Sequence, residues 1–336
     1  MERIRLCRQT PALVQVSNFY ISTSHFCLPP RNSVQSEVRL ADMPESSNSS
    51  TNTKTVVVAS KPDRPELSDL LPPLLQWLKE HGYKVLADRE SARYYPGMET
   101  IPRDDFAKVF PTLALVLGGD GTLLSVARAV ACVQTLILGV NLGTLGFLTE
   151  VQVSGLYPAL EAIETGDYMV DTRSMLSCSL VRNGTTLAAH LALNDLVVSK
   201  SAIARLNHFQ LFVDSEFVSS YKADGLIIAS PTGSTAYSLG AGGPILKPDV
   251  QAFVITPVSP HGLTHRPVVV RDSVQIEIRV KTGDEQAYLS LDGQVGMPIQ
   301  DGDVIRCVKA EHSAKLLRFQ KTFFEVLATK LKWGER

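Results

Sequence analysis

The chain lacks the features that mark disulfide-stabilised, zinc-binding or membrane-spanning proteins. Its 336 residues include five cysteines, Cys7, Cys27, Cys132, Cys178 and Cys307, and none of them forms a Cys-x-x-Cys pair. An odd number of scattered cysteines argues against a disulfide framework or a structural zinc, and it favours a reducing compartment. No apolar run approaches the ~18 residues that a membrane-spanning helix needs. We therefore expect a soluble, cytoplasmic protein without a membrane partner.

An excess of charge is also lacking. The formal net charge is −1, so the sequence gives no basic footprint for nucleic acid or an anionic membrane. The G-x-x-x-x-G-K-[ST] motif of P-loop proteins and the G-x-G-x-x-G dinucleotide fingerprint are both absent. Any phosphate must therefore be bound locally, by backbone amides and a few basic side chains.

The first 53 residues differ from the rest. Residues 43–54 form a polar Ser/Asn/Thr tract that cannot bury enough apolar surface to fold. Up to residue 36, four arginines stand against a single acidic residue, Glu2, which gives a faintly transit-peptide-like balance. We predict a disordered tail over residues 1–53, and a targeting role or a true start at Met43 remain open alternatives.

Residues 54–170 predict an α/β domain. Short apolar strands alternate there with segments of helical spacing, which is typical of a Rossmann-like layered fold with a covered parallel sheet. The expected strands are residues 55–60, 83–88, 112–119 and 135–143, and the expected helices are residues 67–82, 122–133 and 156–168.

The pattern then changes to a period of two. Residues 171–315 contain a succession of alternating segments and the hairpin dipeptide Asn183-Gly184, which together predict a β-sandwich. Residues 316–336 predict a final strand and an amphipathic helix, residues 322–333, that packs back on the protein.

Two glycine-rich turns follow strands of the α/β domain, and each is placed where open α/β sheets bind ligands. They are GGDGT, residues 118–122, and NLGTLGFL, residues 141–148. Glycines allow close approach to a phosphate, and amides at the start of the next helix point toward it. The carboxylate of Asp120 within the first turn either supports the turn or takes part in chemistry.

These turns belong to a larger set of motifs: GGDGTLL, NLGTLGFLTE, LNDLVVSK, YKADGLIIASPTGSTAYSLGAGGPI and SPHGLTHRPVVV. In this order and at these separations they resemble the NAD kinase family, over about residues 54–330. The resemblance implies an α/β domain followed by a β-sandwich. It also implies an enzyme that transfers the γ-phosphoryl group of ATP, or in some members of polyphosphate, to the adenosine 2′-hydroxyl of NAD to give NADP.

The resemblance assigns roles to individual residues. Asp120 corresponds to the catalytic aspartate, which decides the question of its carboxylate in favour of chemistry. Phosphate binding is implied for Gly118, Gly119 and Thr122. NAD binding is implied for Gly121, Phe147, Asn194, Asp195, Lys222, Asp224, Ser230, Thr235, Ala236 and Tyr237. Asp292 and Gln294 match a further motif, although Asp292-Gly293 is equally a plain hairpin turn, and His261 is more simply a structural histidine.

Two other functions remain possible from the sequence. A lipid or sphingoid kinase also uses a Gly-Gly-Asp-Gly-Thr turn, but it would need an apolar acceptor pocket and not the PTGSTAY block. A non-catalytic NAD(P) sensor would be favoured if another residue replaced Asp120, but the sequence has the aspartate. The kinase reading implies Mg²⁺ or another divalent metal with the ATP, no dedicated metal-ligand cluster, and a homodimer or homotetramer.

Residues 1–42 should be dispensable, because every motif lies after Lys54. A protein that begins at Met43 should unfold at the temperature of the full chain and keep its kcat and its KM for NAD. A clear drop in melting temperature or a raised KM for NAD after truncation would contradict this expectation.

Overall fold

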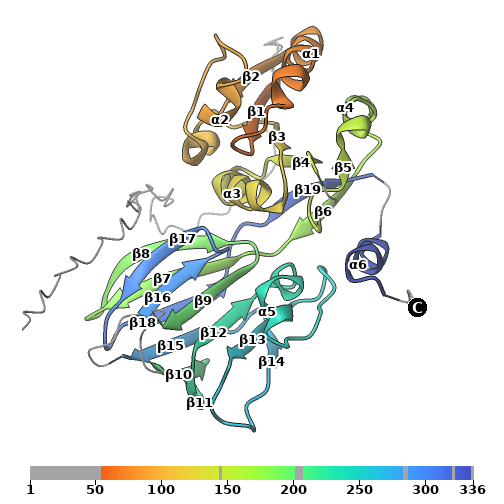
Figure 1. Ribbon diagram of the computed structural model, residues 1–336. Helices are drawn as coiled ribbons and strands as arrows, with labels where there is room; N and C mark the ends of the chain where they lie inside the picture. The colour runs from red at the N-terminus through yellow and green to blue at the C-terminus, as the bar shows by residue number, and fades with distance from the viewer. Residues whose placement is uncertain (1–53, 144–145, 201–206, 283–286, 320–321, 334–336) are drawn as a thin grey trace, which may run out of the picture. The chain divides into compact units, whose positions relative to one another are not determined.

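The structure is a computed structural model that describes residues 54–143, 146–200, 207–282, 287–319 and 322–333. The predicted tail, residues 1–53, lies outside the described residues. The strands of the described residues form three sheets, and they are labelled in Figure 1.

The first sheet confirms the predicted α/β domain. Its strands are β1 (Lys54–Ser60), β2 (Tyr83–Ala87), β3 (Leu113–Leu117), β4 (Leu136–Asn141), β5 (Val151–Gln152), β6 (Met169–Arg173) and β19 (Ala314–Arg318). They lie in the order β2-β1-β3-β4-β19-β6, with β5 paired to β4. All pairs are parallel except β19 with β6, which is antiparallel.

Helices cover both faces of this sheet, which explains why its central strands are apolar throughout. Val56 and Val58 face one core, which they share with α1 (Leu67–Glu80) and α4 (Leu156–Thr165). Val57 and Ala59 face the opposite core, with α3 (Asp120–Val130). Successive strand residues point to opposite faces, so a two-sided sheet needs an apolar residue at every position.

The other two sheets are antiparallel and enclose one apolar core between them, as the predicted β-sandwich requires. One consists of β7 (Leu176–Arg182), β8 (Thr185–Ala192), β10 (Asn207–Val213), β11 (Glu216–Ala223), β15 (Ile276–Lys281) and β18 (Val304–Lys309). The other consists of β9 (Asp195–Lys200), β12 (Gly225–Ala229), β13 (Ala252–Val258), β14 (Val268–Arg271), β16 (Ala287–Leu291) and β17 (Val295–Ile299). Asn183 and Gly184 both have positive φ, 49° and 78°, in the turn between β7 and β8.

The chain crosses between the α/β layer and the sandwich in a way that the sequence pattern does not show. The strands β6 and β19 pair with each other in the first sheet, on either side of the sandwich in the sequence. The first domain therefore takes up strand residues 169–173 and 314–318. The domain limits at 170 and 315 themselves remain a prediction.

The remaining helices are short. They are α2 (Arg89–Ala92), α5 (Tyr237–Gly240) and the terminal α6 (Phe323–Leu331), and a 3-10 segment spans Arg103–Val109. A capping box between Thr322 and Glu325 starts α6, and its Val326 and Leu327 are buried. Within the described ranges no helix combines the length and apolarity that a membrane crossing requires.

The parallel sheet places the predicted glycine turns together. The chain leaves β1, β3 and β4 at the same edge of the sheet, since the three strands are parallel neighbours. The amide of Lys61 donates to the carbonyl of Leu117, and that of Gly118 donates to the carbonyl of Val140, both at 2.9 Å. The segments after these three strands therefore start side by side.

Candidate functional site

Asp120 joins the two glycine turns. Its carboxylate accepts hydrogen bonds from the backbone amides of Phe147 at 2.7 Å, Leu148 at 3.1 Å and Thr149 at 3.1 Å. The hydroxyl of Thr149 also donates to it, at 3.2 Å. The carboxylate thus supports the loop after β4. The sequence alone had favoured a chemical role for Asp120 over a structural one. Its catalytic role remains a prediction.

Two glycines leave space for neighbouring side chains in these turns: Gly146 for that of Asp120, and Gly118 for that of Thr122. A Cβ atom at Gly146 would lie 2.0 Å from Oδ1 of Asp120, and one at Gly118 would lie 2.6 Å from Oγ1 of Thr122. Real Cβ atoms do not approach other atoms this closely, so any side chain at either position would displace the turn. Gly118 is therefore required by packing, whereas Gly119 faces open space.

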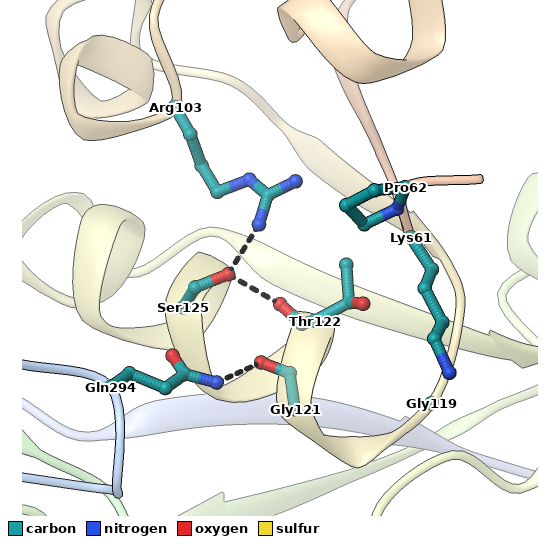
Figure 2. A pocket seen from close by; sticks show the side chains of 8 residues that line it. All are labelled: Lys61, Pro62, Arg103, Gly119, Gly121, Thr122, Ser125 and Gln294. Carbon is teal, nitrogen blue, oxygen red and sulfur yellow. Dashed lines mark hydrogen bonds between the residues drawn. The ribbon is translucent and has the colours of Figure 1, made fainter. Parts of the chain in front are cut away.

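A pocket of about 340 Å³ lies at the start of α3. Gly119, Gly121 and Thr122 line it from the helix, together with Ser125 and, from other elements, Lys61, Pro62, Arg103 and Gln294. Figure 2 shows Lys61 and Arg103 extending into it from different parts of the chain. The helix has no side-chain N-cap, so its first backbone amides are available to an anion.

The two cations of this pocket differ in their partners. Arg103 is fixed: it donates to Ser125 Oγ at 2.7 Å and to the carbonyl of Ser60 at 3.1 Å, and it forms an ion pair with Asp88. Lys61 is exposed at the pocket wall. Arg103 therefore serves mainly to hold β1 and α3 together, and Lys61 is the cation that a ligand can reach.

A buried carboxylate, that of Asp292, holds residues 193–195, the Asn194 loop. Asp292 accepts hydrogen bonds from the amides of Leu193 at 3.1 Å, Asn194 at 2.7 Å and Asp195 at 3.2 Å. Asp292 and Gly293 both have positive φ, as a type I′ hairpin turn requires. The dipeptide is therefore a hairpin turn, and the side chain of Asp292 organises the loop of residues 193–195. Its role as a site residue stays a prediction.

Asp195 is buried beside Asp292, and this changes its acidity. Burial first, and then the negative charge of Asp292, raise the pKa of Asp195 from 3.8 to about 7. Its side chain is therefore partly protonated near neutral pH.

The PTGST segment packs directly on the Asn194 loop. The hydroxyl of Ser230 donates to the carbonyl of Leu193 at 2.5 Å and accepts from the amide of Gly233 at 3.2 Å. A Cβ atom at Gly233 would lie 2.0 Å from the carbonyl oxygen of Asn194. Ser230 is fully buried, and its hydroxyl fixes the two loops to each other; its predicted contact with NAD stays a prediction.

Several other predicted residues lie on accessible parts of the same segment. Thr235 and Ala236 are partly exposed, and Tyr237 is 51% exposed at the start of α5. Asn194 is also partly exposed. Phe147 is partly exposed beside Asp120, and the ammonium group of Lys330 on α6 lies 5.9 Å from its ring centre.

Lys222 and Asp224 lie away from the Asn194 loop. In the pairing of β12 with β9, Ala229 faces Asp195 at one end and Gly225 faces Ser199 at the other. The two ends are about 13 Å apart, at roughly 3.3 Å per residue. Asp224 pairs with Lys200 at 2.7 Å, and the carbonyl of Lys222 accepts from the amide of His261 at 2.9 Å. Within one chain, these residues form a separate group.

The sequence reading missed four residues of the site: Lys61, Arg103, Ser125 and Arg128. Lys61 could have been found, because it directly follows a strand that neighbours the GGDGT strand. Arg103 lies in a segment that showed no regular pattern. Arg128 on α3 donates to Asp292 and to Gln294, both at 2.6 Å, and only the folded chain reveals these contacts.

Comparison with known proteins identifies the family. The sequence matches the ATP-NAD kinase N-terminal domain over residues 56–168 and the ATP-NAD kinase C-terminal domain over residues 193–319. The chain belongs to the NAD kinase family. It is 56% identical to the NAD kinase of Koribacter versatilis over 283 residues, which are 84% of this chain and 99% of that protein. It is 47% identical to the NAD kinase of Acidobacterium capsulatum, over 84% of this chain and all of that protein.

Solved structures of the family share the fold. Yeast NADH kinase in complex with NADH matches with a TM-score of 0.74 and 26% identity, over 84% of this chain and 89% of that chain. An NAD kinase from Archaeoglobus fulgidus in complex with ATP matches with a TM-score of 0.67 and 25% identity, over 83% of this chain and all of that chain. The family membership expected from the motifs is confirmed, and the lipid-kinase and sensor alternatives lose their basis.

Because the pKa of Asp195 is raised in the folded chain, the free energy of unfolding should depend on pH. The folded chain holds this proton more tightly than the unfolded chain does, so the contribution to stability is present at low pH and is lost as the pH rises from about 4 to about 7. Asp195→Asn removes the titration. The free energy of unfolding of this variant minus that of the native protein, both measured by urea denaturation, should therefore increase as the pH rises across this range. A difference between the two proteins that does not change with pH would contradict the assignment.

Proposed function

We propose that this chain transfers the γ-phosphoryl group of ATP to the 2′-hydroxyl of the adenosine ribose of NAD, with the α3 pocket holding the donor phosphates. The observation that carries the proposal is the position of the pocket. Its lining includes Gly121, which directly follows Asp120, and Gln294, which follows the Asp292 turn that holds the Asn194 loop.

The pocket lining suits a polyphosphate. Backbone amides at the start of α3, the hydroxyl of Thr122 and the ammonium group of Lys61 are all donors, and the lining contains no carboxylate. Anions are stabilised at helix N-termini by such amides and by the helix dipole. The same hydrogen-bond donors would accept a linear polyphosphate in place of ATP.

The acceptor would lie against the cluster of Asn194, Thr235 and Tyr237. The amide of Asn194 suits an adenine edge, and the hydroxyls suit ribose. In the transfer, the 2′-oxygen bonds to the γ-phosphorus, the bond from that phosphorus to the bridging oxygen breaks, and ADP leaves. Asp120 would align the 2′-hydroxyl and accept its proton.

A divalent cation, expected to be Mg²⁺, would arrive as part of the ATP complex. Among the described residues, no three histidines, cysteines, aspartates or glutamates are grouped so as to hold a metal. The donor groups of the pocket fit phosphate oxygens, not a metal by itself. We accordingly treat the cation as part of the substrate, where it would offset the charge of the triphosphate.

Assembly and location remain proposals. We expect a cytoplasmic homodimer or homotetramer, with no nucleic-acid partner. Exposed apolar side chains on the sandwich domain, including Phe217, Leu263 and Val269, support an association through that domain.

The direct test is an assay of the purified full chain. NAD and NADH should each be offered with ATP and with polyphosphate, in the presence and absence of Mg²⁺. Formation of NADP or NADPH would support the proposal and show which donor and acceptor are used. Absence of product in all combinations would refute it.

Lys61→Ala should raise the KM for ATP. A lysine–phosphate hydrogen bond contributes about 1.5–3 kcal/mol, which corresponds to an increase of about 10- to 100-fold. The matched control is Lys79→Ala, which removes an exposed lysine near the end of α1 and should leave the KM unchanged. Equal KM values for both variants would exclude Lys61 from the donor site.

Asp120→Asn should lower kcat by about 10²–10⁴-fold, the usual loss for a general base. The melting temperature should also fall, because an amide NH₂ would replace one acceptor and face backbone donors of residues 147–149. Thr149→Val separates the two effects, since it removes one donor to Asp120 and keeps the carboxylate. It should weaken the loop with a much smaller loss of kcat. A kcat of Asp120→Asn within a few-fold of that of Thr149→Val would reduce Asp120 to a structural role.

A further inference from the structure

Arg128 occupies a position that its sequence context does not suggest. It lies in the last turn of α3, where a basic residue is usually explained by the helix dipole. Its side chain is only 15% exposed, however, and it forms an ion pair with Asp292, whose side chain is fully buried. The Arg128 guanidinium therefore ends at the hairpin turn between β16 and β17, between the buried Asp292 and the exposed Gln294.

The hairpin turn is attached to α3 at two places. Arg128 donates to Asp292 Oδ2 and to Gln294 Oε1, both at 2.6 Å. Gln294 in turn donates from Nε2 to the carbonyl of Gly121 at 2.6 Å, and this contact is visible in Figure 2. Gly121 and Arg128 are seven residues apart, so they lie on one face of the helix about 10 Å from each other.

These contacts form a continuous path between the two halves of the site. At one end, Asp292 holds the amides of Leu193, Asn194 and Asp195. At the other end, Gln294 holds the first turn of α3 and lines the donor pocket. Arg128 donates to both Asp292 and Gln294, and it thereby ties the hairpin turn that carries them to the last turn of α3.

We propose that Arg128 is a positioning residue: by tying the hairpin turn of Asp292 and Gln294 to α3, it sets the spacing between the acceptor loop at Asn194 and the donor pocket at Gly121. This inference rests on the proposed function. In-line transfer requires the 2′-oxygen and the γ-phosphorus to meet within a narrow range of distance, and a displacement of 1 Å can cost about 100-fold in rate.

The charges around Arg128 supply a second readout. Asp292 and Asp195 face each other, and the charge of Asp292 raises the pKa of Asp195. His190 on β8 also faces the cluster, and its pKa is lowered by burial and by the charge of Arg128. Without Arg128 the charge of Asp292 is no longer offset, so the pKa values of both Asp195 and His190 should rise.

The test compares Arg128→Met with Arg128→Lys in the full chain. Arg128→Met should lower kcat by about 10- to 100-fold and should move the acidic limb of kcat/KM for NAD to higher pH. Arg128→Lys keeps the charge but cannot hold two partners in a fixed fork. It should therefore restore the position of the acidic limb while kcat stays reduced.

The matched control is Arg182→Met. Arg182 binds both oxygens of Asp303 at 2.8 Å, and that carboxylate is likewise fully buried. The pair lies at the far end of β7 from Leu193, since Leu176 at the near end pairs with Ala192. Arg182→Met should lower the melting temperature as much as Arg128→Met does, with unchanged kcat and pH profile.

Gln294→Met provides a test that leaves the ion pair in place. It breaks the contact with Gly121 and should lower kcat with little change in melting temperature or in the pH profile. The inference is overturned if Arg128→Met changes kcat no more than Arg182→Met does, or if both Arg128→Lys and Gln294→Met keep the native kcat. Absence of NADP formation by the native chain would instead refute the proposed function.

Discussion

The three hydrogen bonds from consecutive backbone amides to the carboxylate of Asp120 are the contact on which the rest of the site depends. A parallel sheet brings the segments after β3 and β4 to one edge, but it does not fix their conformation. Loop amides that leave the sheet need acceptors, and Asp120 supplies them to Phe147, Leu148 and Thr149. The glycine at 146 follows from this contact, because a side chain there would collide with the carboxylate of Asp120.

Asp292 repeats the same arrangement in the second domain. It also binds three consecutive amides, those of residues 193–195, and it carries an ion pair to the helix that begins with Asp120. A buried charge is costly unless it is paired and fully hydrogen-bonded, and both conditions are met here. Each of the two loops is therefore held by one carboxylate that accepts hydrogen bonds from three consecutive amides. On the proposed function, this is the preorganisation that a transfer between two bound substrates needs.

Much of the fold could be predicted because its signals are local. The apolar strands of the first sheet, the Asn183-Gly184 turn and the change to a period of two each depend on neighbouring residues. The same holds for the motifs that identified the family. The participation of β6 and β19 in the first sheet had no such signal. The two strands pair with each other although they are about 145 residues apart in the chain, and neither has a distinctive composition. The contacts of Ser230 had no such signal either: its buried hydroxyl joins the PTGST segment to the Asn194 loop, and its contact with NAD stays a prediction.

The sequence by itself determined the fold class, the family and the positions of the glycine turns, because helix and strand periods, turn dipeptides and contiguous motifs are written in short stretches of chain. Only the tertiary structure decided what the carboxylates bind. Asp120 reaches amides 27 to 29 residues away, and Asp292 reaches Arg128 across 164 residues. The separation of Asp224 from Asp195 along β12 was likewise decided by strand pairing. A hydrogen bond depends on distance in space and not along the chain, so these partners are fixed only when the sheets and α3 have packed.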